Sequence, residues 1–433
     1  MSTDLMTDSV PTIATFSRRD ASGPLHDLRR EGLDRFEALG FPTARNEAWT
    51  YTNVKSIAKT EFTPASLAPA TIDDERLEPA LFDGPAHRIV IVNGVVDAAR
   101  TSIGPLPPGA IVAPLSSIDP STVSAHLGRI ASLDEAPFVA MNTALLTEGV
   151  VVRVPRDAKI EHPVHVVHVT VGDASPVVNA PRTLVIAERG GIVSVVESFI
   201  SIGAAANLTT AVTEVVVDDG ASVRHDRVQM DAPTGRHIST VAVREIGPGT
   251  VTSTTITLGG ALVRNHYRAD LDTPGADCTF NGLAVASGTS TVDHTLRINH
   301  NQPHGSSWQF FKNILDDAAT GSFCGRIYVA EDAQKTDAKQ TNKNMILSGT
   351  AHAYTRPQLE IFADDVKCTH GATIGRMEPS QLFYLRSRGI DPNAARRLLI
   401  FAFANETLAE VGCAALRARL EPILLERLSS VGA

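Results

Sequence analysis

The segment Thr213-Glu-Val-Val-Val-Asp-Asp-Gly220 carries the pattern that decides the fold, a short run of β-branched residues closed by a turn sequence. Val and Thr favour strands, and Asp-Asp-Gly favours a tight turn. Similar runs occur at Arg88–Val92, Val150–Val154, Val164–Thr170 and Thr183–Ala187. These runs predict a mainly β structure for the middle of the chain.

No long helical pattern interrupts this β texture between His87 and Gly375, which excludes a doubly wound α/β sheet. A looser regularity lies on top of it, because a Gly followed by a small or β-branched run recurs at steps of about 22 to 29 residues. That period favours a β-solenoid, in which we expect three short strands per turn and a core made by stacking the turns. A β-sandwich or barrel also fits many short strands, so the pattern alone leaves it open.

Both ends of the chain have helical patterns. Near the start, Leu33, Phe36 and Leu39 have helical spacing, and Gly40 ends the pattern. The stretch Ala65–Asp83 is rich in Pro, Ala and acidic residues, which predicts a loosely ordered connection. We therefore expect an N-terminal helical region and linker over residues 1–86.

Three helices are expected at the C-terminal end. Pro379 opens the first and Gly389 stops it, Asp391 caps the second, and the third runs from about Cys413 to Leu428. Their apolar surface exceeds what a helical hairpin can hide, so they either pack on the β body or form a docking surface for another protein. The expected domains are a β core at 87–376 and a helical domain at 377–433.

Composition excludes several classes of protein. The 433 residues carry a formal net charge of −9, which does not provide the basic surface that nucleic-acid binding requires. The first residues are polar and acidic rather than basic and then apolar, so no secretory signal is expected. No apolar run approaches the ~20 residues needed to span a bilayer. The sequence predicts a cytoplasmic protein without a membrane or nucleic-acid partner.

The four cysteines stand alone, without a Cys-x-x-Cys pair. Neither a zinc ribbon nor a self-contained iron–sulfur site is encoded by such spacing. Cys278, Cys324 and Cys413 are interpreted as structural.

Cys368 and His370 form a candidate metal half-site. One residue separates them, so in a strand both side chains leave on the same face, about 6–7 Å apart. Thiolate and imidazole are common ligands of iron and zinc, but a cluster needs four ligands and this pair supplies at most two. A two-ligand half-site is what an interface shared with a partner would need. The alternatives are a buried small hydrophobe for Cys368 and a hydrogen-bonded turn histidine for His370.

Other polar groups allow two interpretations each. His294 and His300 lack the i, i+4 spacing of a helical metal-binding pair, but alternation along a strand places them on one face, so a histidine ladder with His370 is conceivable. Asp337, Lys339 and Gln340 could be acid–base machinery. In a solenoid, polar residues of this kind more often hydrogen-bond between turns, and this is the interpretation we favour.

Three long motifs resemble the SufB/SufD family of the SUF iron–sulfur cluster assembly system. They are Ala333-Gln-Lys-Thr-Asp-Ala-Lys-Gln-Thr-Asn-Lys-Asn-Met-Ile-Leu-Ser348, the segment Arg356–Thr373, and Gln381-Leu-Phe-Tyr-Leu-Arg-Ser-Arg-Gly-Ile390. They follow the order and spacing of the family. Arg45-Asn-Glu-Ala-Trp-Thr-Tyr51 and Cys368-Thr-His-Gly-Ala-Thr373 are similar to the SufD branch rather than the SufB branch.

This resemblance implies a β-helix (β-solenoid) core flanked by N-terminal and C-terminal helical domains. It implies pairing with a SufB-like subunit through the β-helix, with the nascent cluster at His370, and docking of a SufC-like ATPase on the C-terminal helices. The candidate docking residues are Leu382, Tyr384, Arg386, Arg388, Leu399 and Phe403.

The implied function is that of a non-catalytic scaffold subunit. An iron–sulfur cluster or iron would be held transiently at the partner interface, with none bound permanently by this chain alone. The chain has no Gly-x-x-x-x-Gly-Lys-Ser/Thr loop, so ATP hydrolysis is assigned to the partner. A homodimer, a SufB-like core subunit and, in a different class, a β-helix carbohydrate-active enzyme remain alternatives.

Overall fold

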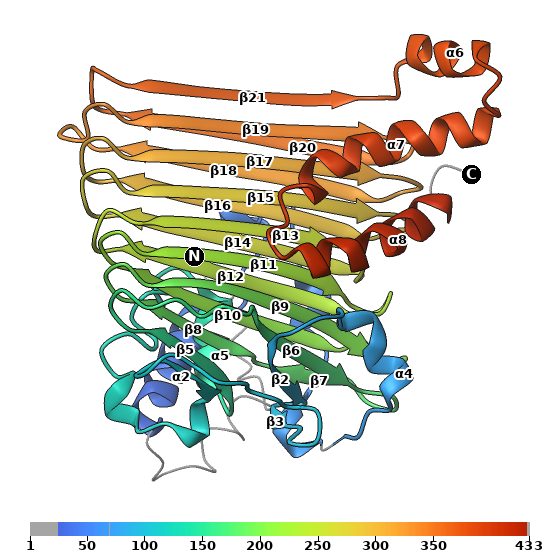
Figure 1. Ribbon diagram of the computed structural model, residues 1–433. Coiled ribbons are helices and arrows are strands. Elements are labelled where there is room, and N and C mark those ends of the chain that lie inside the picture. The colour runs from blue at the N-terminus through green and yellow to red at the C-terminus, as the bar shows by residue number, and fades with distance from the viewer. Residues whose placement is uncertain (1–24, 69, 431–433) are drawn as a thin grey trace, which may run out of the picture.

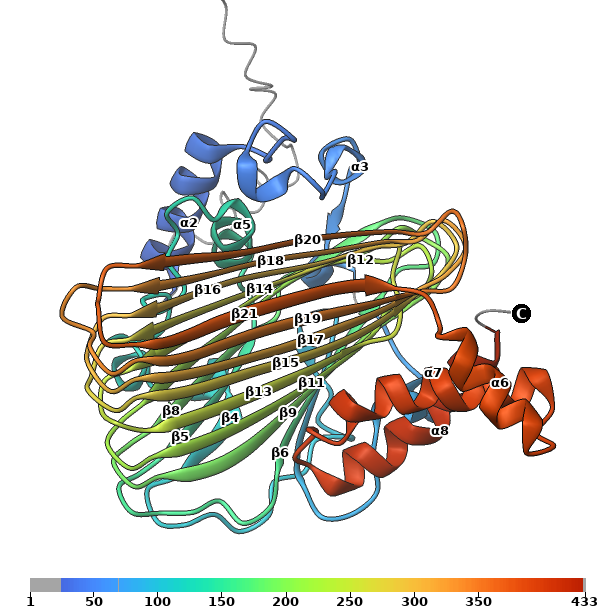
Figure 2. The same cartoon turned by 90° about the horizontal axis from the view of Figure 1, so that it is seen from above.

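The computed structural model describes residues 25–68 and 70–430, and the strands among them wind into a β-solenoid with helices at both ends (Figure 1). The mainly β fold and the solenoid are therefore confirmed, and the sandwich or barrel is excluded. Two sheets lie face to face along the solenoid, as the view from above shows (Figure 2). Residues 1–24 of the predicted N-terminal helical region lie outside the described residues.

The two sheets have eleven and ten strands, and we call them sheet A and sheet B. Sheet A contains β1 (Thr63–Pro64), β4 (Ile111–Pro114), β5 (Gly149–Val154), β7 (Val177–Asn179), β8 (Arg182–Ala187), β10 (Leu208–Val217), β12 (Arg236–Glu245), β14 (Leu262–Leu271), β16 (Thr291–His300), β18 (Thr320–Val329) and β20 (His352–Ile361). Sheet B contains β2 (His87–Val92), β3 (Val95–Val96), β6 (Val164–Val171), β9 (Ile192–Ile202), β11 (Ser222–Met230), β13 (Thr250–Thr257), β15 (Asp277–Ala286), β17 (Ser306–Leu315), β19 (Asp337–Ile346) and β21 (Lys367–Gly375).

Each regular turn consists of two long strands, so the prediction of three short strands per turn is wrong. Successive strands alternate between the sheets, and strands two apart in sequence pair in parallel and in register, as Thr320 does with His352. The true strand length was hidden because inward-facing polar residues such as Gln340 and Asn342 break the apolar pattern of a ten-residue strand.

The interior between the sheets is apolar over most of the solenoid. Valines fill the first turns, and Tyr267, Phe280, Phe311 and Phe323 fill the later ones, all nearly or completely buried. Ring centroids of Tyr267 and Phe311 lie 5.4 Å apart, an ordinary separation for packed aromatic side chains. The turns from β2 to β18 therefore share one apolar cluster, and a separate, smaller cluster that includes Ile327 and Ala338 fills the last turns.

The C-terminal helices are α6 (Pro379–Ser387), α7 (Pro392–Leu408) and α8 (Ala414–Ser430). The Asp391 side chain accepts from the backbone N–H groups of Asn393 and Ala394, which confirms the predicted cap. α7 and α8 lie against the outer face of sheet B, where residues such as Leu420 contact its apolar side chains (Figures 1 and 2). Packing on the β body is thus confirmed for these two helices, whereas α6 buries no residue.

Lys312 of β17 fastens α7 to sheet B. Its side chain is completely buried, and its Nζ donates to the Phe403 carbonyl oxygen at 2.8 Å and to the Glu406 carboxylate at 2.5 Å. The ammonium group also lies 4.2 Å from the centroid of the Phe403 ring. A buried charge with such partners fixes the position of the helix, because breaking the pair would leave the charge uncompensated.

The N-terminal helix α2 (His26–Leu39) and helix α5 (Pro137–Ala144) lie together on the outer face of sheet A (Figure 2). α2 ends where predicted, at Gly40, which has a φ of 63°. Gly32 permits the close approach of the two helices, since a Cβ on it would lie 2.7 Å from the Ala144 nitrogen. No helix among the described residues is long and apolar enough to cross a membrane.

Residues 65–68 and 70–83 are not the loosely ordered connection that the composition of this stretch predicted. They contain α4 (Asp74–Leu77) and two 3₁₀ turns, and the Asp73 side chain caps α4. Leu77 packs with Val90 and Val167 of sheet B. Too few apolar residues recur here to give a helical period, so packing on the sheet, not propensity, fixes this segment. The remaining short elements are α3 (Lys55–Ala58), η1 (Glu47–Trp49), η2 (Ala65–Leu67), η3 (Glu78–Ala80), η4 (Leu115–Ser117) and η5 (Pro120–Thr122).

The two ends of the solenoid differ. At the N-terminal end each sheet finishes on a short antiparallel strand, β3 or β4. At the other end β21 and β20 are the last strands of their sheets, and no strand of residues 25–68 or 70–430 pairs with their outer edges. We call this the open end of the solenoid.

Candidate functional site

The open end exposes backbone hydrogen-bonding groups together with apolar side chains. The side chains of Ile374 in β21 and Phe362 after β20 are 52% and 60% exposed. A long unpaired edge is a template for another strand, and apolar side chains beside it favour a protein partner over water.

Cys368 and His370 both face the solenoid interior at this open end. In the register of β21 on β19, Cys368 pairs with Ala338 and His370 with Gln340, and both partners are fully buried inward-facing residues. The prediction that the two side chains share one face therefore agrees with the structure. Cys368 is half-buried against Ile327 and Ala338, whereas His370 is exposed because no further turn covers it.

Burial raises the pKa of the Cys368 thiol, and the nearby Asp337 carboxylate raises it further. The thiol is therefore protonated at neutral pH, and a metal ion that binds it must displace the proton. No group of three or more His, Cys, Asp or Glu side chains with metal-binding geometry occurs within the described ranges. Cys368 and His370 alone are two side chains of ligating type, fewer than the four ligands that an iron–sulfur cluster needs.

The polar residues beneath His370 form the predicted contacts between turns at one position. Gln340 donates from Nε2 to Oε1 of Gln309 on the preceding turn at 2.7 Å, which confirms the predicted hydrogen bonding for this residue. Lys339 instead faces outward, with its ammonium group 4.1 Å from the Trp308 ring centroid and 3.8 Å from the Asp337 carboxylate. Because Gln340 faces inward and the other two face outward, the three do not form an acid–base set.

The histidine ladder is a wrong prediction. His294 and His300 do share the inner face of β16, but β16 belongs to sheet A and β21 to sheet B, so His370 is not in their column. Burial lowers the pKa of each to about 4, so both are neutral core residues. His300 Nε2 hydrogen-bonds Ser307 Oγ at 2.9 Å, and the His294 ring lies beside Phe311.

The remaining cysteines occupy different surroundings. Cys278 and Cys413 are buried, as structural cysteines would be. Cys324 is half-buried and lies on the outer face of β18, where it lines a groove under the N-terminal helices. All four cysteines are free thiols.

The candidate docking residues divide into exposed and anchoring groups. Tyr384 of α6 is 58% exposed, and Arg386 and Arg388 are also exposed, with the Arg388 guanidinium 5.3 Å from the Tyr384 ring centroid. Leu382 and Leu399 are half-buried, and Phe403 is held against Lys312, so it attaches α7 rather than meeting a partner.

Sequence reasoning missed three exposed apolar residues on these helices. Phe383 of α6 is 72% exposed, Leu398 of α7 is 51% exposed and Leu425 of α8 is 46% exposed. No periodic signal in the sequence marks Phe383, because α6 has no buried face against which an exposed face could be recognised.

The fold and the site together define a β-solenoid protein with a cysteine and a histidine on the inner face of its open end. Comparison with known protein families shows to which family the chain belongs. Residues 168–403 match the family described as "SUF system FeS cluster assembly, SufBD core domain", and residues 12–166 match the "SufBD protein N-terminal region". The chain belongs to the SufBD family of iron–sulfur cluster assembly proteins.

Relatives similar over most of their length have corresponding names. An iron–sulfur cluster assembly SufBD family protein of Synechocystis sp. is 32% identical over 92% of this chain and 89% of its own length. The iron–sulfur cluster assembly protein SufD of Escherichia coli is 30% identical, with 87% of each chain covered. SufD of Bacillus subtilis is 27% identical over 67% of each chain. The resemblance to the SufD branch is thus confirmed, and a carbohydrate-active enzyme is no longer a competing assignment.

Proposed function

We propose that this chain is the SufD-type scaffold subunit of a SUF assembly complex, non-catalytic itself, which pairs with a SufB-like subunit through its open end. The observation that carries the proposal is the position of Cys368 and His370 beside two unpaired strand edges. A strand edge can add strands of a partner through main-chain hydrogen bonds. A partner seated there would bring its own side chains next to the two ligands.

The cluster would be the cargo of this site and not a resident cofactor. His370 is exposed and can offer a ring nitrogen to iron without a change in the solenoid. Cys368 can contribute a thiolate once a metal ion displaces its proton. Because two ligands do not complete a cluster site, we infer that iron or a nascent cluster stays only while the partner is in place.

We also propose that the C-terminal helices dock a SufC-like ATPase. α7 and α8 are fastened to sheet B, while α6 buries none of its own residues and carries the exposed Phe383 and Tyr384. Aromatic residues on a rigidly held support are typical anchors of protein interfaces. The four free thiols are in keeping with a reducing compartment, and we propose the cytoplasm.

The pairing can be tested with a proline at the free edge. The Lys367 N–H donates to the Thr336 carbonyl of the preceding turn, and alternate residues of a strand point their N–H groups to opposite edges. The N–H of Ala372 therefore points to the open edge. Ala372→Pro removes an edge donor without removing a bond inside the solenoid.

We expect the wild-type chain, co-expressed with the SufB-like and SufC-like proteins of its source, to be isolated with both. Ala372→Pro should recover far less of the SufB-like subunit and retain its own unfolding midpoint. Gly371→Pro is the matched control, because its lost N–H faces β19 and its unfolding midpoint should fall. Full recovery of the SufB-like subunit with Ala372→Pro would refute pairing at this edge. If neither protein were recovered with the wild type, the scaffold proposal itself would fail.

A SufB-like role within the family and a homodimer are the alternatives that the same experiment addresses. A homodimer through the open end would appear as wild-type chains that associate with each other in the absence of the SufB-like protein, and Ala372→Pro would dissociate them.

A further inference from the structure

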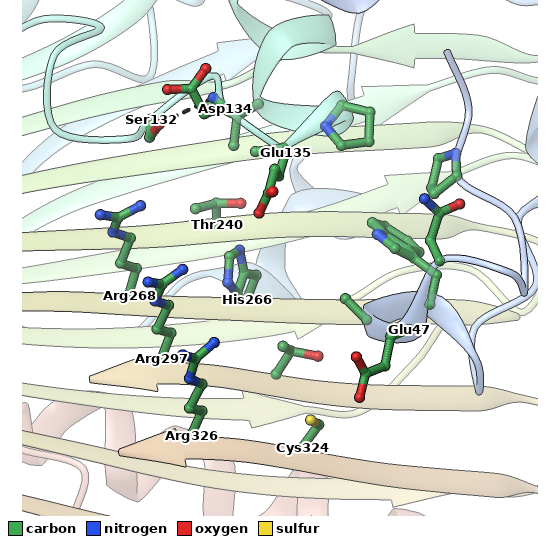
Figure 3. Close-up of a pocket in the computed structure, with 18 of the residues that line it drawn as sticks. Glu47, Ser132, Asp134, Glu135, Thr240, His266, Arg268, Arg297, Cys324 and Arg326 are labelled. Atoms are coloured by element: carbon green, nitrogen blue, oxygen red, sulfur yellow. Dashed lines mark hydrogen bonds between the residues drawn. The ribbon is translucent and has the colours of Figure 1, made fainter. Parts of the chain in front are cut away.

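A groove on the outer face of sheet A holds a column of three arginines. It lies between that face and the segments 39–49 and 131–139, and it has a volume of about 660 Å³, within the range of small-molecule sites (Figure 3). Arg268 of β14, Arg297 of β16 and Arg326 of β18 are in register on adjacent strands and point the same way. The backbones of neighbouring arginines in this column are therefore about 4.8 Å apart, the usual spacing of adjacent strands.

The outer two arginines of the column already have carboxylate partners. Arg268 donates from Nε to Asp270 at 3.0 Å, and Arg326 pairs with Glu360 of β20. Among residues 25–68 and 70–430, the middle arginine, Arg297, makes one hydrogen bond, from Nε to the Asn299 amide oxygen at 3.3 Å. Its two terminal amino groups form the fork that binds carboxylate or phosphate in two-point fashion, and they have no protein partner among these residues.

The arrangement has an electrostatic cost that an anion would offset. Like charges directly opposite each other on neighbouring strands are destabilising, and Arg297 lies between two other guanidinium groups. The positive potential also acts on His266, which lines the same groove (Figure 3). Burial lowers the pKa of His266 to about 3, and the charges of Arg264, Arg268 and Arg297 add to that effect. His266 is therefore a neutral hydrogen-bonding group in the groove.

The carboxylates of the groove limit the size of the anion. Among the described lining residues, Glu47 pairs with Arg356, Asp134 with Arg35 and Glu360 with Arg326, which leaves Glu135 without an ion pair. Glu135 projects from the loop opposite sheet A (Figure 3). An extended polyanion would be repelled by the Glu135 carboxylate. A single anionic group bound at Arg297 would not have to approach Glu135.

We propose that this groove is a binding site for a small molecule with one oxyanion group, a phosphate or a carboxylate, held by Arg297. The groove is on the outer face of sheet A, whereas Cys368 and His370 face the solenoid interior in sheet B, so this ligand is distinct from the cluster cargo. The proposal does not depend on the partner complex.

Inorganic phosphate and acetate are the probes, each titrated into the full chain against sodium chloride at equal ionic strength. Calorimetry and the thermal midpoint should both show saturable binding of at least one probe beyond the chloride control. Binding of phosphate alone would indicate a phosphate-bearing ligand, and binding of acetate alone would indicate a carboxylate ligand. Binding of both would indicate that the site recognises the oxyanion chemistry that the two share. No saturable binding of either probe would overturn the proposal.

Arg297→Gln should weaken that binding by roughly 10- to 100-fold, because charge-assisted bonds are lost. Arg297→Lys keeps the positive charge but loses the two-point fork, so its affinity for the anion should lie between those of the wild type and Arg297→Gln. Arg244→Gln is the matched control, since Arg244 lies on the same sheet but pairs with Asp272, and it should bind as the wild type does. Without anion, the thermal unfolding midpoint of Arg297→Gln should not fall below that of the wild type, because the substitution removes a charge that the neighbouring guanidinium groups repel. Equal binding by Arg297→Gln and wild type would refute the site.

Discussion

At the scale of single residues, His370 owes its exposure to its position in the stack. The residue below it in the same column, Gln340, is 1% exposed, and the difference between them is the presence of a covering turn. The sequence predicted that Cys368 and His370 share a face, because alternation along a strand is a local property. It could not predict which column they occupy or that the column ends there, since both depend on pairing between strands distant in sequence.

His370→Ala should lower cluster formation on the assembled complex while leaving the complex intact. Changes to residues that only support a metal ligand already weaken metal binding by roughly tenfold or more. Loss of a ligand itself should therefore reduce the retained iron and labile sulfide by at least about that factor. The measurement is the iron and sulfide content and visible absorption of the purified complex. His352→Ala is the matched control, an exposed histidine on the other edge strand, β20, and it should retain the wild-type content. Unchanged cluster content in His370→Ala would show that this imidazole is not a ligand.

At the scale of elements, helix termini were predicted well and strand lengths poorly. Asp391, Pro392 and Gly389 are local signals that act through one or two turns of backbone, so the bounds of α6 and α7 followed from them. β19 shows why strands were harder, because its inner face carries Gln340 and Asn342, which bond to the preceding turn. Periodicity in hydrophobicity cannot reveal a strand whose inward residues are polar and hydrogen-bond to the neighbouring turn.

The docking role of α6 is best tested at Phe383. Deleting all three helices would uncover apolar residues of sheet B, including Val228 and Ile256, and would confuse docking with stability. Phe383→Asp removes an exposed aromatic side chain and should weaken association with the SufC-like ATPase by about 2 kcal/mol, roughly 30-fold. Its effect on the unfolding midpoint should be small. The measurement is co-purification and titration of the ATPase.

Ile246→Asp is the control for that variant, because Ile246 is similarly exposed but follows β12 on the solenoid body. It should bind the ATPase normally. Normal binding by Phe383→Asp would exclude Phe383 as an anchor, and weak binding by both variants would point to a general effect of added charge.

At the scale of the whole molecule, buried titratable groups set a predictable pH dependence of stability. Burial lowers the pKa of six histidines below 6.5, so each is neutral when folded and gains a proton more readily when unfolded; they are His87, His165, His237, His266, His294 and His300. Their contribution to stability is present above pH 6.5 and is lost as the pH falls.

Glu245 acts in the opposite direction. Burial raises its pKa from 4.5 to about 9, and the Asp277 charge opposes ionisation further, although the Asp277 N–H donates to it. The folded state therefore keeps a proton that the unfolded chain loses near pH 4.5, so stability falls as the pH rises from 4.5 to 9. Each group changes the unfolding free energy by at most about 1.4 kcal/mol per pH unit.

These opposing slopes predict a maximum of stability near pH 6.5, with the histidines dominant below it and Glu245 above it. Glu245→Gln imitates the protonated carboxyl and should raise the urea midpoint more at pH 8 than at pH 5. Glu61→Gln is the control, because Glu61 is exposed, and it should change the urea midpoint at neither pH. Midpoints are compared because a stacked chain need not unfold in two states. A lower midpoint for Glu245→Gln at pH 8 would contradict the assignment.

The difference between the two ends of the solenoid has a consequence for how far assembly can proceed. A sheet open at both ends could add copies without limit and grow into a fibre, as stacked strands do in amyloid. Here strands β3 and β4, of two and four residues, finish the sheets at one end. At the other end, within the part of the chain that the structure describes, β20 and β21 have long free edges. Under the proposed function, a single partner at that edge would leave no long free edge to which a further copy could add. We therefore expect assembly through the open end to stop at two subunits.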